Sequence, residues 1–191
     1  MAQDPAAVRR ARQTVTNLLL ALSATVGLMI VMVLIVPRDD SNLIQPTDYK
    51  QISADAQAAT NLPIITPDVE ADWWSNSARL SSKPKDGTTA SWYVGFVGPS
   101  NKYIGLTQTF TTNATWDALQ LSGLSPTGKV VGEGLWQEWK SDEAHDPPKT
   151  RDYLLIRNIG TDTILIYGTA SEADIAKFAV EVNRQILRVY P

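Results

Sequence analysis

The sequence of 191 residues contains no cysteine and a single histidine, His145. Without cysteine the chain can form no disulfide, thiolate metal site, cysteine nucleophile or lipid-modified cysteine. A serine or threonine nucleophile needs a base beside it, yet His145 lies in the loop "SDEAHDPPKT" without a nucleophile-elbow motif. We therefore predict no catalytic residue and no enzyme; an acidic site without histidine is the remaining enzymatic alternative.

Basic residues are not in excess, and phosphate-binding loops are missing. A formal net charge of -3 does not favour nucleic acid as a partner. The stretches "GEG" and "GPSNKYIG" match neither the Walker nor the dinucleotide-binding pattern. On one strand Glu133 and Glu138 would point to opposite faces, which argues against a matched acid and base. The sequence identifies no cofactor and no small-molecule substrate.

One loop carries possible metal ligands. Oxygen and nitrogen donors that a divalent cation accepts stand at Asp142, Glu143, His145 and Asp146. Two prolines follow directly, and proline with dense charge is typical of an ordinary solvated loop. We favour the loop interpretation and predict no metal site.

The longest feature is the run "VTNLLLALSATVGLMIVMVLIV", residues 15–36, which contains no charged residue. A helix over this run spans roughly 33 Å, enough for the hydrocarbon core of a bilayer. The apolar region of a signal peptide has only about 7 to 15 residues before its cleavage site, whereas "ALSA" falls in the middle of this run. We predict one uncleaved transmembrane helix over residues 15–36.

The flanking charges predict the orientation of this helix. Arg9, Arg10 and Arg12 precede it, whereas Arg38 is followed by two aspartates. The positive-inside rule places a basic tail, residues 1–14, in the cytoplasm and the remainder of the chain beyond the span outside. We expect a single-pass protein of the cell membrane with an extracytoplasmic C-terminal domain.

Small residues gather within the span at Ser23, Ala24 and Gly27. Such a patch permits close helix contact, so we predict these residues as contacts with another transmembrane helix; ordinary small residues that lipid tolerates are the alternative. The partners expected are the lipid bilayer and other integral membrane proteins.

Beyond the span we predict a tether and a short helix in residues 37–62 and a folded domain in residues 63–191. Thr47 is the expected cap of the helix, with Asp48 in its first turn, and Asn61 its end. The two prolines of "LPIITPDVEADWW" then favour an extended segment.

The folded domain repeats a pattern of strands followed by a helix. A hairpin is predicted on either side of "GPSN", in "TASWYVGFV" and "KYIGLTQTF", before a short helix in "TTNATWDALQL". We then predict one strand in "KVVGEGLWQEW", a second hairpin in "RDYLLIRN" and "DTILIYGTA", and a final helix with one apolar stripe in "SEADIAKFAVEVNRQILRV". With a first strand at "WWSNSARLSS", the fold class is α+β: an antiparallel sheet of about six strands, βββα repeated twice, with the helices packed on one face.

Six tryptophans remain to be explained. Large rings fill small cores, yet they also line sites for lipids, glycans or peptides. Periodicity assigns Trp92 and Trp116 to the core. The other four are possible partner or ligand contacts: Trp73, Trp74, Trp136 and Trp139.

Two of these rings lie three residues apart in "EGLWQEW". On a regular strand Trp136 and Trp139 point to opposite faces and form no common platform, whereas a bulge at Gly132 or Gly134 would reverse the faces. Trp136 is expected to lie across the space that the glycines leave.

Four stretches, "ADWWSNSARL", "SNKYIGLTQT", "GEGLWQEW" and "TILIYGTASEADIAKFA", together resemble an uncharacterised actinobacterial family of single-span exported proteins, a domain-of-unknown-function family. The resemblance covers most of the chain from residue 9. Leu135, inserted between Gly134 and Trp136, and a longer charged loop at 141–151 depart from the family pattern. The resemblance implies a location in the actinobacterial envelope, and it transfers no site because the family carries no agreed activity.

Two functions follow as hypotheses. The first is a non-catalytic accessory or structural subunit of an actinobacterial envelope membrane complex. A respiratory assembly is suggested by analogy, since actinobacterial respiratory assemblies resemble one another in carrying small additional subunits with a single span. The alternative is a membrane-tethered binding domain for lipid, cell-wall glycan or peptide, which would use the sheet face left open by the helices.

Overall fold

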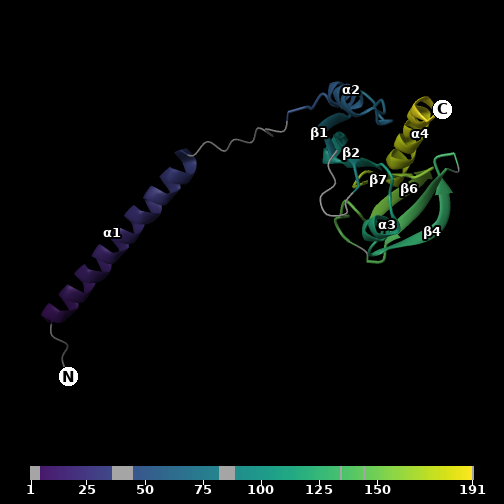
Figure 1. The fold of residues 1–191 in the computed structure, drawn as a ribbon. Coiled ribbons are helices and arrows are strands. Elements are labelled where there is room, and N and C mark those ends of the chain that lie inside the picture. Colours follow the sequence, from purple (N-terminus) through teal and green to yellow (C-terminus); the bar gives the residue numbers. More distant parts are fainter. Residues whose placement is uncertain (1–4, 36–44, 82–88, 134, 144, 191) are drawn as a thin grey trace. The chain divides into compact units, whose positions relative to one another are not determined.

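The computed structural model describes residues 5–35, 45–81, 89–133, 135–143 and 145–190. The chain divides into two compact units, Met1–Leu43 and Ile44–Pro191. The first contains one long helix and the second a folded α+β domain (Figure 1).

Helix α1 (Pro5–Ile35) covers the predicted transmembrane run. Its segment Arg12–Ile35 is long and apolar enough to cross a membrane, and none of its apolar window is buried. Because the helix begins before the apolar run, the arginines of the predicted basic tail lie on its first turns. Val36 and most of the predicted tether, residues 37–44, lie outside the described residues.

The helices of the folded domain are α2 (Tyr49–Thr60), the short 3-10 helix η1 (Pro99–Asn101), α3 (Ala114–Gln120) and α4 (Glu172–Val189). The strands are β1 (Trp74–Ser81), β2 (Ser91–Val97), β3 (Tyr103–Thr109), β4 (Leu124–Val131), β5 (Trp136–Ser141), β6 (Tyr153–Ile159) and β7 (Asp162–Gly168). They form one antiparallel sheet in the order β1-β2-β3-β7-β6-β5-β4. The predicted α+β class with an antiparallel sheet is confirmed.

The sheet has seven strands because the stretch predicted as one strand, "KVVGEGLWQEW", turns back on itself. Val131 pairs with Trp136 across a hairpin whose turn has positive φ at Gly132 and Glu133. Positive φ at successive residues is the backbone conformation that tight hairpin turns use, and glycine makes it accessible. The sheet therefore has slightly more strands than the predicted number of about six, and the second predicted βββα unit is corrected to ββββα.

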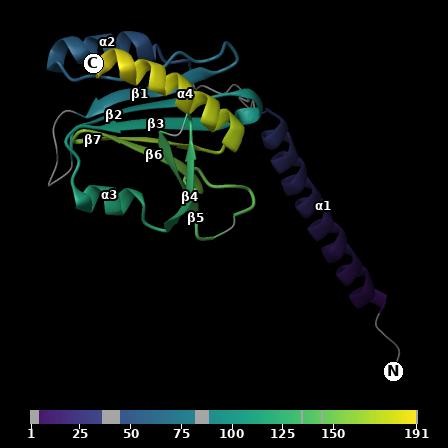
Figure 2. The same cartoon turned by 90° about the vertical axis from the view of Figure 1, so that its right-hand side faces the viewer.

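Helices lie on both faces of the sheet, not on one as predicted (Figure 2). Helices α2 and α4 pack on what we call the helix face, where fully buried side chains include Trp92, Phe96 and Ile166. Helix α3 lies on the opposite face, which we call the open face, and Trp116 packs there against a smaller cluster around Leu154. The apolar positions of α3 fit either face, so periodicity did not decide between them.

Side-chain oxygens cap the N-termini of α2, α3 and α4. Ser171 Oγ accepts a hydrogen bond from Asp174 N (3.1 Å), and Asn113 caps α3 in the same way. Helix α2 is capped by Asp48, one residue later than predicted, through Gln51 N (3.0 Å). The predicted stripe of α4 is buried at Ile175, Phe178, Ala179, Val182 and Ile186.

One buried amide fastens the extended segment between α2 and β1 to the helix face. Gln108 Oε1 accepts a hydrogen bond from Ile65 N (2.9 Å), and Gln108 Nε2 donates to Pro63 O (2.6 Å) and Tyr190 Oη (2.8 Å). Tyr190 Oη donates in turn to Asp162 Oδ2 (2.6 Å). The segment and the end of α4 are thereby held on this face; of the described helices, α3 lies on the opposite face.

Candidate functional site

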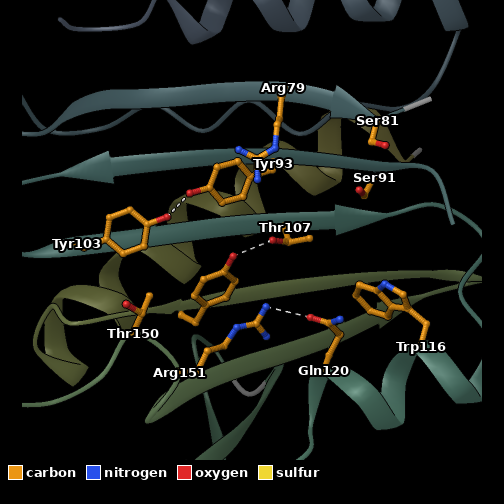
Figure 3. Close-up of a pocket in the computed structure, with 11 residues that line it drawn as sticks. Arg79, Ser81, Ser91, Tyr93, Tyr103, Thr107, Trp116, Gln120, Thr150 and Arg151 are labelled. Atoms are coloured by element: carbon orange, nitrogen blue, oxygen red, sulfur yellow. Dashed lines mark hydrogen bonds between the residues drawn. The ribbon is translucent and has the colours of Figure 1, made fainter. Parts of the chain in front are cut away.

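The open face of the sheet is hollowed into a groove of about 620 Å³ over β1, β2, β3 and β7, beside α3 (Figure 3). The largest of its lining side chains are Arg79, Tyr93, Tyr103, Trp116, Arg151 and Tyr167. The remaining lining residues are serine, threonine and glutamine. We call this hollow the open-face groove. Among the described residues, its lining includes neither an aliphatic nor an acidic side chain.

Strand alternation brings these side chains to one face. In β2, Trp92 and Val94 are fully buried in the core of the helix face, so Tyr93 between them lies on the open face. In β3, Thr107 stands in the same way between Leu106 and Gln108, which are fully buried. The residues that build the core therefore also fix which residues line the groove.

A pair of glycines lies beneath the tyrosines that line the groove. Gly95 of β2 pairs with Gly105 of β3. A Cβ on Gly95 would lie 2.8 Å from Tyr93 Oη and 2.9 Å from Tyr103 Oη, and one on Gly105 would lie 2.8 Å from the Tyr167 ring. The three tyrosine side chains thus lie over backbone that only glycine leaves bare.

The tyrosine hydroxyls of the groove bond to one another and to a threonine. Tyr93 Oη and Tyr103 Oη share a hydrogen bond, and Tyr167 Oη lies 3.1 Å from Thr107 Oγ1. Burial raises the pKa of the Tyr103 hydroxyl far above its usual value, and the bond with Tyr93 raises it further. Tyr103 is therefore protonated at neutral pH and presents a neutral hydroxyl.

Two arginines flank these tyrosines on opposite sides of the groove (Figure 3). The guanidinium of Arg79 lies 4.2 Å from the centre of the Tyr93 ring, and that of Arg151 lies 4.2 Å from the centre of the Tyr167 ring. Arg151 Nη2 also donates to Gln120 Oε1 (2.9 Å). The ion pairs of the described residues involve neither arginine. Both cations are held in place by rings and an amide, and within the described ranges no carboxylate forms an ion pair with either of them.

The two rings of "EGLWQEW" lie on opposite faces, as the spacing predicts. Trp136 is fully buried in the core of the helix face, whereas Trp139 packs half-buried against the cluster of the open face. Trp136 lies against Gly132, where a Cβ would be 2.7 Å from its ring. Gly134, the other glycine considered, lies outside the described residues. Trp136 has no surface left to offer a partner.

The Trp136 ring is held by a buried asparagine of α4. Trp136 Nε1 and Arg157 Nη1 both donate to Asn183 Oδ1, at 2.8 and 2.6 Å, and Asn183 Nδ2 donates to Gly132 O (3.0 Å). Burial lowers the pKa of Arg157. This network joins α4 to the β4–β5 hairpin, which gives Trp136 a structural role.

The remaining predicted contacts are spread over the domain. Trp73 is half-buried, lies against Gly98, and lines a second groove of about 490 Å³ beside α4. Trp74 is half-buried at the start of β1. Trp116, assigned to the core from its periodicity, is only half-buried and lines the open-face groove. The structure thus brings none of the predicted tryptophans into that groove and adds Trp116.

The charged loop and the buried carboxylate have local partners. His145 Nδ1 lies 2.9 Å from Asp152 Oδ1, and Lys149 Nζ donates to His145 Nε2 (2.6 Å). Among the described residues no three His, Asp or Glu side chains lie close enough to hold a metal. Glu138, which is 3% exposed, accepts hydrogen bonds from Thr127 (2.9 Å) and Tyr153 (3.0 Å). Neither His145 nor Glu138 lines the open-face groove, whereas Thr150 and Arg151 at the end of the charged loop do.

Comparison with known families places the chain in one of them. Residues 10–182 match the model of a family described as "Protein of unknown function (DUF4245)", so the match includes most of α1 and nearly all of the folded domain. No curated protein and no solved structure matches the chain. The predicted resemblance to an uncharacterised domain family is confirmed, and its actinobacterial and single-span character stays a prediction. The protein belongs to the DUF4245 family.

Proposed function

We propose that this protein is a membrane-anchored ligand-binding domain. Helix α1 would serve as its single transmembrane anchor, with the N-terminus in the cytoplasm and the folded domain outside the cell membrane. The length and apolar character of α1 and the arginines on its first turns support this orientation. The observation that carries the proposal is the open-face groove, because α2, α4 and α3 leave that part of the sheet without helical cover.

The composition of the groove favours binding over catalysis. The part of its lining that the structure describes contains neither histidine nor carboxylate, and its tyrosine hydroxyls bond to one another or to a threonine. General acid and base catalysis needs a group that titrates near the working pH, whereas Tyr103 titrates far above it. Fixed rings, hydroxyls and cations are suited to holding a ligand.

Hydrogen exchange on the full-length chain in mild detergent tests the proposal. Soluble oligosaccharides, short peptides and lipid nanodiscs would be added in turn. We expect at least one of them to slow exchange in Tyr103–Thr109 and in α3, which border the groove, while β4 at the far edge of the sheet stays unchanged. If no ligand protects β3 or α3, or if protection appears only elsewhere, the proposal is wrong.

A second candidate function is an accessory subunit of an envelope membrane complex, such as a respiratory assembly. It is supported by the small-residue patch of α1, where Ser23 and Ala24 are exposed and a Cβ on Gly27 would meet no atom within 4 Å. Purification of the tagged full-length chain in mild detergent, followed by mass spectrometry, should then recover integral membrane proteins in fixed ratio. Replacement of Gly27 by leucine should release them, whereas the same change at Ala21 should not.

A further inference from the structure

We propose that the open-face groove binds a saccharide that carries negative charge, as a carboxylate or a phosphate. This inference rests on the proposed function, since it names the ligand class of the same site. Three features of the groove carry it: the charge of its walls, the character of its other side chains, and the pairing of its strands.

The walls of the groove are positively charged. Arg79 and Arg151 face it from opposite sides (Figure 3), and the acidic residues that could neutralise them are missing from the described lining. Each guanidinium is stacked on a tyrosine ring, so its plane is fixed while its N–H groups stay available at the edge. A guanidinium held in this way is suited to a carboxylate or phosphate, which it can bind with two parallel hydrogen bonds.

The other side chains of the groove favour a sugar over an acyl chain. Lipid tails require aliphatic walls, and the described lining has none. Instead, Trp116 presents a half-buried ring on which a sugar ring can lie, and the hydroxyls of Tyr103 and Thr107 can bond sugar hydroxyls. An acyl chain would also cover the guanidinium groups of Arg79 and Arg151 without offering them an acceptor, which is unfavourable.

The pairing of the strands argues against a peptide bound as an added strand. Strands β2, β3 and β7, which form the floor, each have a neighbouring strand on both sides. Their backbone groups are already used within the sheet, whereas an extended peptide needs a free edge. Recognition in this groove must therefore use side chains, and those present match an acidic saccharide.

Isothermal titration of the full-length chain in detergent tests the ligand class with four probes. Hyaluronan tetrasaccharide carries carboxylates, glucose 6-phosphate carries a phosphate, chitotetraose is neutral, and tetraglutamate is acidic but not a sugar. We expect one of the two acidic sugars to bind at least about tenfold more tightly than chitotetraose and tetraglutamate. Whether hyaluronan tetrasaccharide or glucose 6-phosphate binds more tightly then distinguishes carboxylate from phosphate.

Charge-removing variants locate the binding. Arg79→Gln and Arg151→Gln should each weaken binding of the acidic sugar by about tenfold or more, and Arg151→Lys should recover only part of the loss because lysine lacks the planar fork. Arg188→Gln on α4 is the matched control: Arg188 is exposed and does not line the groove. It should leave affinity unchanged.

The outcomes separate the two proposals. Chitotetraose could bind as tightly as the acidic sugars, be unaffected by the arginine variants and still protect Tyr103–Thr109 from exchange. That result would overturn the requirement for negative charge, but the proposal that the groove binds a ligand would stand. Tetraglutamate bound as tightly as the sugars would overturn the saccharide assignment. Failure of all four probes would overturn this inference, and the proposed function would then depend on whether any other ligand protects β3 and α3.

Discussion

The two faces of the sheet are made by the same strands and differ most in chemistry over β1, β2, β3 and β7. The helix face is covered by α2 and α4 and buries aliphatic and aromatic side chains such as Trp136 and Ile166. The open face carries tyrosine, threonine and arginine over these strands, and beside α3 it buries a smaller apolar cluster around Leu154. Alternation along a strand lets one sequence serve both purposes. Substitutions on the helix face should therefore lower stability most. Substitutions in the groove of the open face should change stability little but should weaken binding.

The largest effect on stability is expected at the two tryptophans of "EGLWQEW", which lie on opposite faces of the sheet in the same strand, β5. Trp136→Ala removes a fully buried ring and should lower the free energy of unfolding by about 3–5 kcal/mol. Trp139→Ala removes a half-buried ring and should cost about 1–2 kcal/mol, because less apolar surface is lost. Denaturant unfolding of the full-length chains measures both. Equal losses of unfolding free energy in the two variants would contradict the prediction that the helix face contributes more to stability than the open face.

Loss of the buried amide of α4 should have the next largest effect. Asn183→Ala leaves Trp136 Nε1 and Gly132 O without their partner inside the core. We expect a loss of about 2–3 kcal/mol, since buried polar groups without partners are costly. The neighbouring Arg184→Ala is the control: its side chain is 66% exposed, and the change should stay within about 0.5 kcal/mol. A loss at Arg184 that matches the loss at Asn183 would show that α4 is sensitive at any position.

On the helix face the sequence was sufficient to predict most of the structure. The hairpin around "GPSN" and the apolar stripe of α4 depend on local patterns, and both are found. The hairpin at Gly132 was missed because strand-like residues stand on both sides of "GEG", whose glycines were interpreted only as a possible bulge within one strand. The structure shows positive φ at Gly132 and Glu133, which is the conformation of a tight turn.

The open-face groove could not be predicted in the same way. Tyr93 and Thr107 occupy the polar positions of alternating strands, which in sequence look like an ordinary solvated face. Arg151 comes from a loop distant in sequence from Tyr167, and no local pattern records their contact. One signal was present: Gly95 and Gly105 stand inside strands, where glycine often marks a close approach.

That glycine pair offers a test of intermediate size. Gly105→Ala places a Cβ 2.8 Å from the Tyr167 ring and should move the ring, at a cost of about 1–2 kcal/mol. Ligand binding should fall more than stability, because Tyr167 lines the groove and its ring would be displaced. Ser91 lines the groove itself; Ser91→Ala adds no atom and should change stability by less than about 0.5 kcal/mol. Unfolding and titration of the same samples would show whether the two effects separate.

Alkaline pH should act on the open face through Tyr103. Its folded-state pKa is raised, so its contribution to stability is complete below the unfolded-state pKa of about 10 and is lost as the pH rises toward the folded-state pKa. In that window stability should fall by at most about 1.4 kcal/mol per pH unit for this group. Tyr103→Phe should flatten the slope above pH 10, measured by denaturant unfolding at stepped pH. An unchanged slope would show that Tyr103 is not protected from ionisation.

The smallest effect on stability is expected at Arg79, the exposed cation of the groove. This residue also tests most directly whether the two faces of the sheet have different roles. Arg79→Gln removes a cation stacked on Tyr93 at the surface and should alter the free energy of unfolding by less than about 0.5 kcal/mol. The same substitution should nevertheless weaken an acidic ligand by about tenfold. A residue that hardly affects folding but controls binding belongs to a surface shaped for a ligand. If Arg79→Gln destabilised the fold as much as Asn183→Ala, the stacked arginines would be structural, and the open face would differ from the helix face only in polarity.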